Sequence, residues 1–209
     1  MGVLFSFVML MRLFVVVFFL TICSCGNKSS VEVTAFSLSG VEFDVPNKYL
    51  SNSEDLSGGI QSAVTINVIY PSMGFVGRSG LRNKIRSGLA VRMLISSSGT
   101  SPVESLRSVL KYKSDDIVMV ENAGLYKRYL TKSESMFEYY YFSSSKLEVF
   151  VSCSKPPGDG YAMCRTISGE IFKGVYLSCY FSKSLLSNVM LIESDLRNLL
   201  NDFKTGNEI

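Results

Sequence analysis

The amino-acid sequence predicts an α+β fold, in which a twisted antiparallel sheet packs against a short helix and a long C-terminal amphipathic helix. Two observations lead to this prediction. The middle of the chain carries successive strand-like segments with short connections, so neighbouring strands should pair antiparallel as a meander. The end of the chain instead repeats apolar residues at spacings of three and four, which is typical of a helix with one buried face.

Three strands are expected before the first helix. Residues 41–45 alternate apolar and polar side chains and stop at Pro46, and residues 62–70 alternate in the same way and stop at Pro71. A third alternation covers residues 89–97. One face of this third strand would carry Leu89, Val91, Met93 and Ile95.

The first helix has a complete start signal. Ser101 is expected to cap it, Pro102 occupies the first helical position, and Glu104 is placed to complete a capping box. The helix should end near Tyr112. Its buried stripe would consist of Leu106, Val109 and Leu110.

Six further strands and a long helix complete the predicted fold. The meander covers residues 117–120, 124–130, 136–142 and 147–153, and a further pair covers residues 161–168 and 175–182. The last helix should have Ser184 as its N-cap and Lys204 near its negative pole. Its apolar stripe consists of Leu185, Val189, Ile192, Leu196, Leu199 and Phe203.

The N-terminal end of the chain has the composition of a secretory signal. Residues 13–22 carry no charge and directly follow Arg12. At about 1.5 Å per residue this run would form a helix of about 15 Å, half the thickness of a bilayer core. Extending it back to Val3 would place Arg12 near its middle, at a cost of about 2.5–3.5 kcal/mol, so a cleaved signal is favoured over a membrane span. Translation is expected to start at Met9 or Met11, which brings Arg12 close to the N-terminus.

Residues 22–26 resemble a bacterial lipobox, in which an aliphatic residue at −3 and a small residue at −1 precede a lipidated cysteine. Ile22 and Ser24 fill those positions when Cys25 is the acceptor. Choosing Cys23 would place bulky Ile22 at −1, although Cys23 is itself unusual at −2. The alternative is an ordinary signal with two incidental cysteines.

The lipobox implies a chain in three parts. These are a signal peptide over residues 1–24, a polar tether over residues 25–30 that begins at the lipidated Cys25, and a single α+β domain over residues 31–209. Acyl chains such as palmitate on Cys25 would supply the two anchoring signals that stable membrane attachment needs. Gly26, rather than aspartate, follows Cys25, and by resemblance to Gram-negative sorting rules this favours the outer membrane, facing the periplasm.

Three cysteines remain in the predicted domain, and export places them in an oxidising compartment. Cys153 ends one strand and Cys164 lies in the next, so a disulfide between them would close a hairpin and contribute about 3 kcal/mol. Cys179 alternates with Leu177 and Phe181, which predicts a buried free thiol. The alternative is that Cys179 pairs with Cys153 or Cys164. Three thiols without histidine or a CxxC clamp do not indicate a metal site.

The composition argues against an enzyme. The chain has no histidine, which excludes a Ser-His-Asp triad, a Cys-His dyad and a histidine-ligated zinc. Serine–lysine pairs at the spacing of a known catalytic motif occur at Ser108, Ser143 and Ser152, but serine and lysine are frequent enough to produce such matches by chance. No cofactor is expected. The net charge of only +3, with both signs interspersed, gives no reason to expect a nucleic-acid partner.

Two segments could instead recognise a protein. On the strand over residues 136–142, Tyr139 and Tyr141 would share one face while Tyr140 and Phe142 share the other, so aromatic side chains occupy both faces. Helices covering one face are the alternative explanation. The glycine-rich loop over residues 71–80 carries a cluster suited to an interface, unless Phe75 and Val76 fold back as core. That cluster consists of Met73, Phe75, Val76 and Arg78.

Several motifs carry a resemblance to a known family. They are the strand and proline at 43–46 with Tyr49, the residues 70–73 that end the second predicted strand, the strand at 124–129, the Cys153/Cys164 hairpin, the strand at 176–181 and the terminal helix. Together they resemble small periplasmic immunity lipoproteins associated with type VI secretion effectors. The resemblance implies a protein that binds a toxin and is not an enzyme.

Two functional hypotheses follow. The first is an outer-membrane-anchored periplasmic immunity or inhibitor lipoprotein that binds and neutralises a secreted antibacterial effector acting in the cell envelope. The alternative is a structural or assembly lipoprotein of the bacterial outer membrane. A hydrolase ranks third because histidine is absent.

Overall fold

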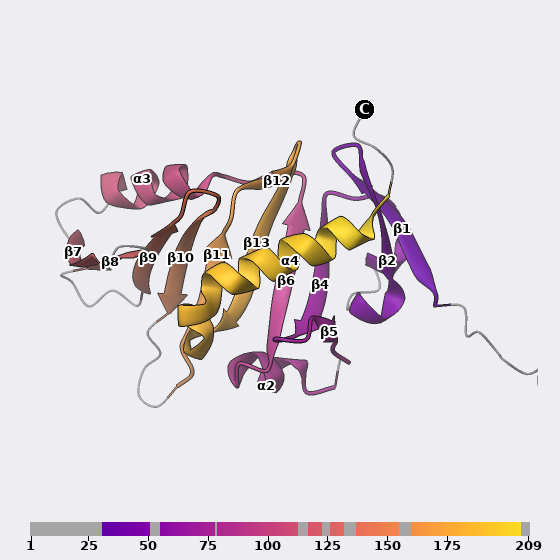
Figure 1. Cartoon of the computed structure of the whole chain (residues 1–209), viewed down its shortest axis with the longest axis horizontal. Coiled ribbons are helices and arrows are strands. Elements are labelled where there is room, and N and C mark those ends of the chain that lie inside the picture. The colour runs from indigo at the N-terminus through magenta and orange to yellow at the C-terminus, as the bar shows by residue number, and fades with distance from the viewer. Residues whose placement is uncertain are drawn as a thin grey trace, which may run out of the picture. The chain divides into compact units, whose positions relative to one another are not determined.

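A computed structural model of the chain describes residues 31–50, 55–77, 79–112, 117–122, 126–131, 137–154 and 160–205. The predicted signal peptide over residues 1–24, the lipidated Cys25 and the tether over residues 25–30 lie outside this part. The residues from Glu32 onward form one compact unit. That unit has the predicted α+β architecture, with sheet as its main component and a long C-terminal helix (Figure 1).

A large antiparallel sheet forms most of the unit. Its strands lie in the order β5-β4-β6-β13-β11-β10-β9-β8-β7, and β12 pairs with β13. The strands are β4 (Ala63–Ile69), β5 (Gly74–Phe75), β6 (Ala90–Ser96), β7 (Ile117–Asn122), β8 (Tyr126–Thr131), β9 (Phe137–Ser143), β10 (Glu148–Ser154), β11 (Met163–Ile167), β12 (Glu170–Phe172) and β13 (Val175–Ser182). The run from β7 to β10 is the predicted meander, because each strand pairs antiparallel with the next. The predicted further pair is β11 and β13, which pair antiparallel, and β11 also continues the meander beside β10.

A small sheet lies beside it, in the order β14-β2-β1-β3. Its strands are β1 (Val33–Leu38), β2 (Val41–Pro46), β3 (Gly59–Ile60) and β14 (Lys204–Thr205). Of these, only β2 was expected from the sequence. Two-residue strands such as β3 and β14 carry no periodicity that a pattern could detect. The turn between β1 and β2 has positive φ at both Ser39 and Gly40, as tight hairpins between twisted strands require.

The capping box predicted for α3 (Pro102–Tyr112) is present. The backbone N–H of Glu104 donates to Ser101 Oγ at 3.1 Å, and Glu104 Oε2 accepts from the backbone N–H of Ser101 at 3.0 Å. The prediction that Ser184 is the N-cap of the last helix is wrong. The chain enters α4 (Val189–Phe203) through the 3-10 helix η3 (Lys183–Asn188). Ser182 therefore caps η3, and its side chain accepts a hydrogen bond from the backbone N–H of Ser184.

The remaining helices are short. They are the 3-10 helices η1 (Asn47–Tyr49) and η2 (Asp55–Ser57) and the α-helix α2 (Leu81–Arg86). α2 was not predicted, because six residues are too few to establish a helical period and its N-cap, Gly80, makes no side-chain cap bond. Among the residues that the structure describes, no helix combines the length and apolar character needed to cross a membrane.

The main core lies between the large sheet and α4, which crosses β11, β13, β6 and β4 (Figure 1). Cys179 and Phe181 point into this core from β13, as the alternation predicted. Leu89 was expected to share the buried face of its strand, but it precedes β6 and is 58% exposed. α4 contributes a buried stripe, and each such side chain stabilises the fold by about 1.5–3 kcal/mol. The stripe comprises Val189, Ile192, Leu196, Leu200 and Phe203.

Candidate partner-binding surfaces

The loop after β4 presents one aromatic side chain to solvent. Phe75 is 50% exposed, and the Lys48 ammonium lies 5.2 Å from the centre of its ring and 5.6 Å from that of Tyr49. The Tyr49 hydroxyl donates to the carbonyl oxygen of Met73 at 3.3 Å, which fixes the loop to η1. Met73 is half-buried against the main core. Phe75 and Lys48 therefore form an ordered aromatic and cationic pair at the surface, where a cation–π contact contributes about 0.5–1 kcal/mol.

Val76 was expected at the same surface, and this prediction is wrong. The side chain is only 5% exposed and packs with Leu81, Ile85 and Ala90. The physical reason is that Val76 packs against the apolar side chains of α2 and buries them from solvent. Arg78, the fourth predicted residue of the loop, lies outside the described residues.

The expected tyrosine surface on β9 is largely core. Tyr139 is 7% exposed, stacks on Phe150 with ring centres 5.9 Å apart, and clusters with Tyr129. The cover comes from the apolar side of α3, which consists of Leu106, Val109 and Leu110. The prediction that Tyr139 contacts a partner is therefore wrong, and the alternative, in which a helix covers this face, holds.

Tyr141 remains half-buried and packs against the same cluster as the apolar side of α3. Burial and a hydrogen bond with Glu148 raise the pKa of Tyr141 to about 12. Its hydroxyl therefore stays protonated and can serve only as a hydrogen-bonding group. β5 stands at one end of the sheet order and β9 near the other, so the two predicted recognition segments do not form one surface.

The opposite face of β9 holds a buried ion cluster that sequence reasoning did not detect. Glu138 accepts a hydrogen bond from Lys183 Nζ at 2.7 Å and another from the Tyr140 hydroxyl, and Arg128 lies 3.6 Å away. Burial alone would raise the pKa of Glu138, but the bonds from Lys183 and Tyr140 hold it below its usual value. Burial, followed by the bond to Glu138, raises the pKa of Tyr140. This cluster ties β9 to η3 and carries a structural role.

A second buried polar cluster lies beneath α4. Glu193 is fully buried and accepts hydrogen bonds from Thr166 at 2.9 Å, from Ser168, and from Cys179 Sγ at 3.3 Å. Burial raises the pKa of both Glu193 and the Cys179 thiol, so the thiol is neutral and not activated as a nucleophile. The signal that could have revealed Glu193 is its position, four residues after Val189 and beside Ile192 on the apolar stripe.

The cysteines pair as the strand assignment predicted. Cys153 and Cys164 stand opposite each other on β10 and β11 and form a disulfide, while Cys179 is free and buried. Within the described part of the chain, no group of three or more His, Cys, Asp or Glu side chains is arranged to hold a metal ion.

Comparisons with known proteins identify this fold at low sequence identity. No family model matches the sequence, and no curated protein matches it. Among solved structures, an immunity protein of the Stenotrophomonas maltophilia type IV secretion system superposes with a TM-score of 0.62 at 14% identity, over 84% of this chain and 94% of that one. The Neisseria meningitidis iron-regulated outer membrane lipoprotein FrpD superposes with a TM-score of 0.51 at 14% identity, over 81% of this chain and 93% of that one. The chain thus shares its fold with a secretion-system immunity protein and an outer membrane lipoprotein.

Proposed function

We propose that this protein is an immunity lipoprotein of the bacterial envelope, which neutralises a secreted antibacterial effector by binding it. The observation that carries the proposal is the fold shared, over 84% of this chain and 94% of the other, with an immunity protein of a secretion system. The lipobox-like sequence ending at Cys25 supports attachment to the outer membrane on its periplasmic side. An inhibitor held there meets effectors that attack phospholipid or peptidoglycan, and delivery by type VI secretion is the route that the sequence resemblance favours.

The mode of action proposed is stoichiometric coverage of the effector, without catalysis. Phe75 supplies an anchor of the kind that dominates protein interfaces, because it is aromatic, half-exposed and already positioned. The bond from Tyr49 to Met73 positions the loop before the partner arrives, which reduces the entropy lost on binding. Lys48, beside the ring, adds a charge that can pair with an acidic group at the rim of the effector's active-site cleft.

A second candidate function is that of a structural or assembly lipoprotein of the outer membrane. The likeness to FrpD favours it, because that protein is an outer membrane lipoprotein with the same fold. The two functions differ in partner. An immunity protein binds one toxin tightly, whereas an assembly factor binds components of the envelope itself.

The test is purification of the lipidated chain from the periplasm, followed by identification of the proteins that co-purify with it. Binding to the product of any toxin gene that lies beside its own gene is measured as well. The proposal expects one effector, bound at a 1:1 ratio with the purified chain. Recovery of outer-membrane assembly components alone, with no binding of the neighbouring gene product, would instead support the second candidate.

A further inference from the structure

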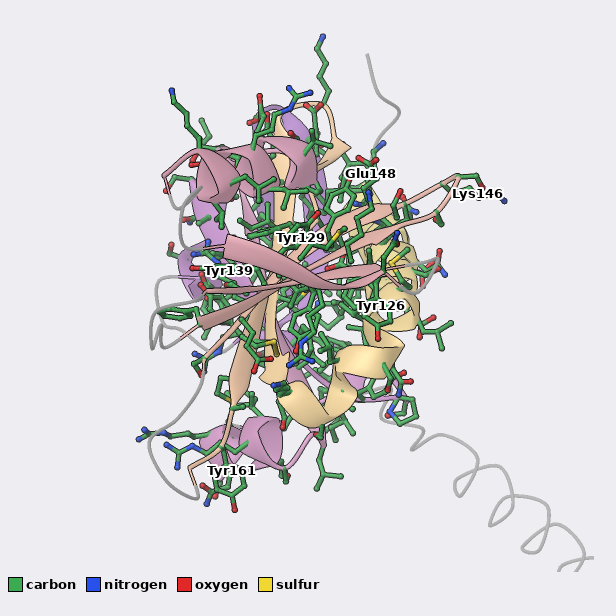
Figure 2. The ribbon with its side chains drawn as sticks, turned by 90° about the vertical axis from the view of Figure 1, so that its left-hand side faces the viewer. Tyr126, Tyr129, Tyr139, Lys146, Glu148 and Tyr161 are labelled. Carbon is green, nitrogen blue, oxygen red and sulfur yellow. A yellow bond between two sulfur atoms is a disulfide. The ribbon has the colours of Figure 1, made fainter. Side chains whose placement is uncertain are left out.

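Among the described residues, two helices cover separate parts of the face of the large sheet opposite α4. α3 packs on it over β10, and α2 packs on it over β6 and β13, whereas α4 lies on the other side of the sheet (Figure 2). Between the two helices, Arg92 on β6 and Arg165 on β11 are exposed to solvent.

The strand register brings these two arginines into one row. Tyr180 on β13 stands opposite Arg92 on one side and opposite Arg165 on the other. Because neighbouring strands are about 4.8 Å apart, the two arginines stem from points about 10 Å apart with a tyrosine between them. We call Arg92, Tyr180 and Arg165 the arginine row.

Both arginines are oriented by contacts that leave them exposed. The Arg165 guanidinium carbon lies 5.5 Å from the centre of the Tyr180 ring, and Arg92 Nε donates to Asn67 Oδ1 at 3.2 Å. Asn67 is buried, and its Nδ2 has no hydrogen-bond partner among the described residues. Neither arginine appears in the ion pairs of the described residues, so both guanidinium groups are available to an incoming carboxylate.

A hollow of about 260 Å³ adjoins the row on the side of α3. Arg165 stands at this hollow, whose apolar walls include Leu94, Ile167 and Tyr176. Apolar walls beside a charged group are the pattern of an interface pocket, which takes an apolar side chain while a salt link forms at its rim.

The charge around the row is mainly positive. The flanking helices add basic side chains, namely Arg82, Lys84 and Arg86 on α2 and Arg107 and Lys111 on α3. Three acidic residues are described on this side, namely Glu104, Glu148 and Glu170, which stands opposite Tyr176. They are already engaged by Ser101, by Tyr141 and by the backbone N–H of Gly174. A surface of this sign attracts an acidic partner and speeds its association.

We propose that the arginine row binds an acidic segment of the effector, which pairs with both arginines and inserts an apolar side chain into the neighbouring hollow. This inference rests on the proposed function and adds the surface used and the chemistry of its partner. A protein segment fits better than a lipid bilayer. α2 and α3 stand about 10–12 Å above the sheet, the diameter of a helix with its side chains, so a flat membrane cannot reach the row between them.

The experiment compares two double charge reversals that change the net charge equally. One is Arg92→Glu with Arg165→Glu. The control is Lys146→Glu with Lys173→Glu, at exposed turn positions away from the row, of which Lys146 is seen at the β9–β10 hairpin in Figure 2. Binding of the purified effector found by co-purification is measured by calorimetry at low and at high salt. We expect the first variant to raise Kd by about 30-fold or more, as the loss of an interface hot spot does. The control should raise Kd by less than about threefold.

Each outcome separates the inference from the proposed function. If the wild-type chain binds no effector, the proposed function fails and the inference fails with it. If it binds, but the arginine variant with unchanged melting temperature binds equally well, the inference alone is wrong. If the reversal lowers the melting temperature, the neutral variant Arg92→Gln with Arg165→Gln replaces it. Vesicles of phosphatidylglycerol and phosphatidylethanolamine form the last arm, and loss of vesicle binding with full effector affinity would assign the row to the membrane.

Discussion

The two faces of the large sheet differ in how completely they are covered. On the α4 face, side chains from β4, β6 and β13 are buried along the whole strand, as Ile66, Met93 and Leu177 show. On the other face, α2 and α3 bury separate parts of the strands while Arg92 and Arg165 stay exposed. The buried residues of the first face serve the core, whereas the exposed arginines of the second contribute little to it and are free to serve binding. Substitutions on the two faces should therefore separate stability from affinity.

The largest expected effect belongs to the α4 face. Leu196→Ala removes a fully buried side chain and should lower the free energy of unfolding by about 3–5 kcal/mol, measured by chemical denaturation. Leu191→Ala on the same helix is the matched control, since Leu191 is 61% exposed and its loss should change stability by less than about 0.5 kcal/mol. Equal effects of the two substitutions would contradict the assignment of the α4 face.

The disulfide should have the next largest effect, because it joins β10 to β11 on the α4 face of the sheet. Replacing Cys153 and Cys164 with alanine should lower the free energy of unfolding by about 3 kcal/mol. Of these two cysteines and Cys179, only Cys179 should be alkylated under denaturing, non-reducing conditions. Modification of Cys153 or Cys164 instead would show that the pairing is wrong.

The α4 face is also the part of the fold that sequence patterns predict well. Alternation in β4, β6 and β13 and the spacing in α4 all reflect burial against a single core, so each pattern is visible locally. α2 was not predicted because its six residues form less than two helical turns, and β3 and β14 were not predicted because two residues show no period. Ser182 was not predicted as an N-cap, because the helical periodicity does not reveal the 3-10 helix that precedes α4.

A smaller effect distinguishes two neighbours at the sheet edge. Phe75→Ala should weaken effector binding by about 2 kcal/mol, as expected for a hot spot, and leave the melting temperature nearly unchanged, because Phe75 is half-exposed. Val76→Ala should do the reverse, because Val76 is buried against α2. Calorimetric titration and thermal unfolding of both variants measure the two effects. A Phe75 variant that keeps full affinity would remove this loop from the interface.

The candidate interfaces were predicted only in part, for a reason visible in these residues. A local pattern cannot tell which of two adjacent apolar residues turns inward, so Phe75 and Val76 were grouped together. Tyr139 is covered by α3, a contact between segments distant in sequence. The arginine row depends on the order β6-β13-β11, which no local pattern contains.

The smallest effects concern pH, and they should have opposite signs for two buried carboxylates. The pKa of Glu138 is lowered by folding, so its contribution to stability is present above the ordinary value of 4.5 and is lost as the pH falls below it. The pKa of Glu193 is raised by burial, so stability should decline as the pH rises above 4.5. Free energies of unfolding measured against pH should lose the acid-side decline in Glu138→Gln and the decline above pH 4.5 in Glu193→Gln. Identical pH profiles for the two variants and the wild-type chain would contradict both assignments.

The most direct test of the proposed immunity function is survival of cells that export the effector to their own periplasm. Co-expression of the wild-type chain should restore growth, and the variant Arg92→Glu with Arg165→Glu should restore it less at equal protein abundance. Death of the cells despite stable, membrane-attached wild-type protein would contradict the proposal that this chain protects by binding the effector.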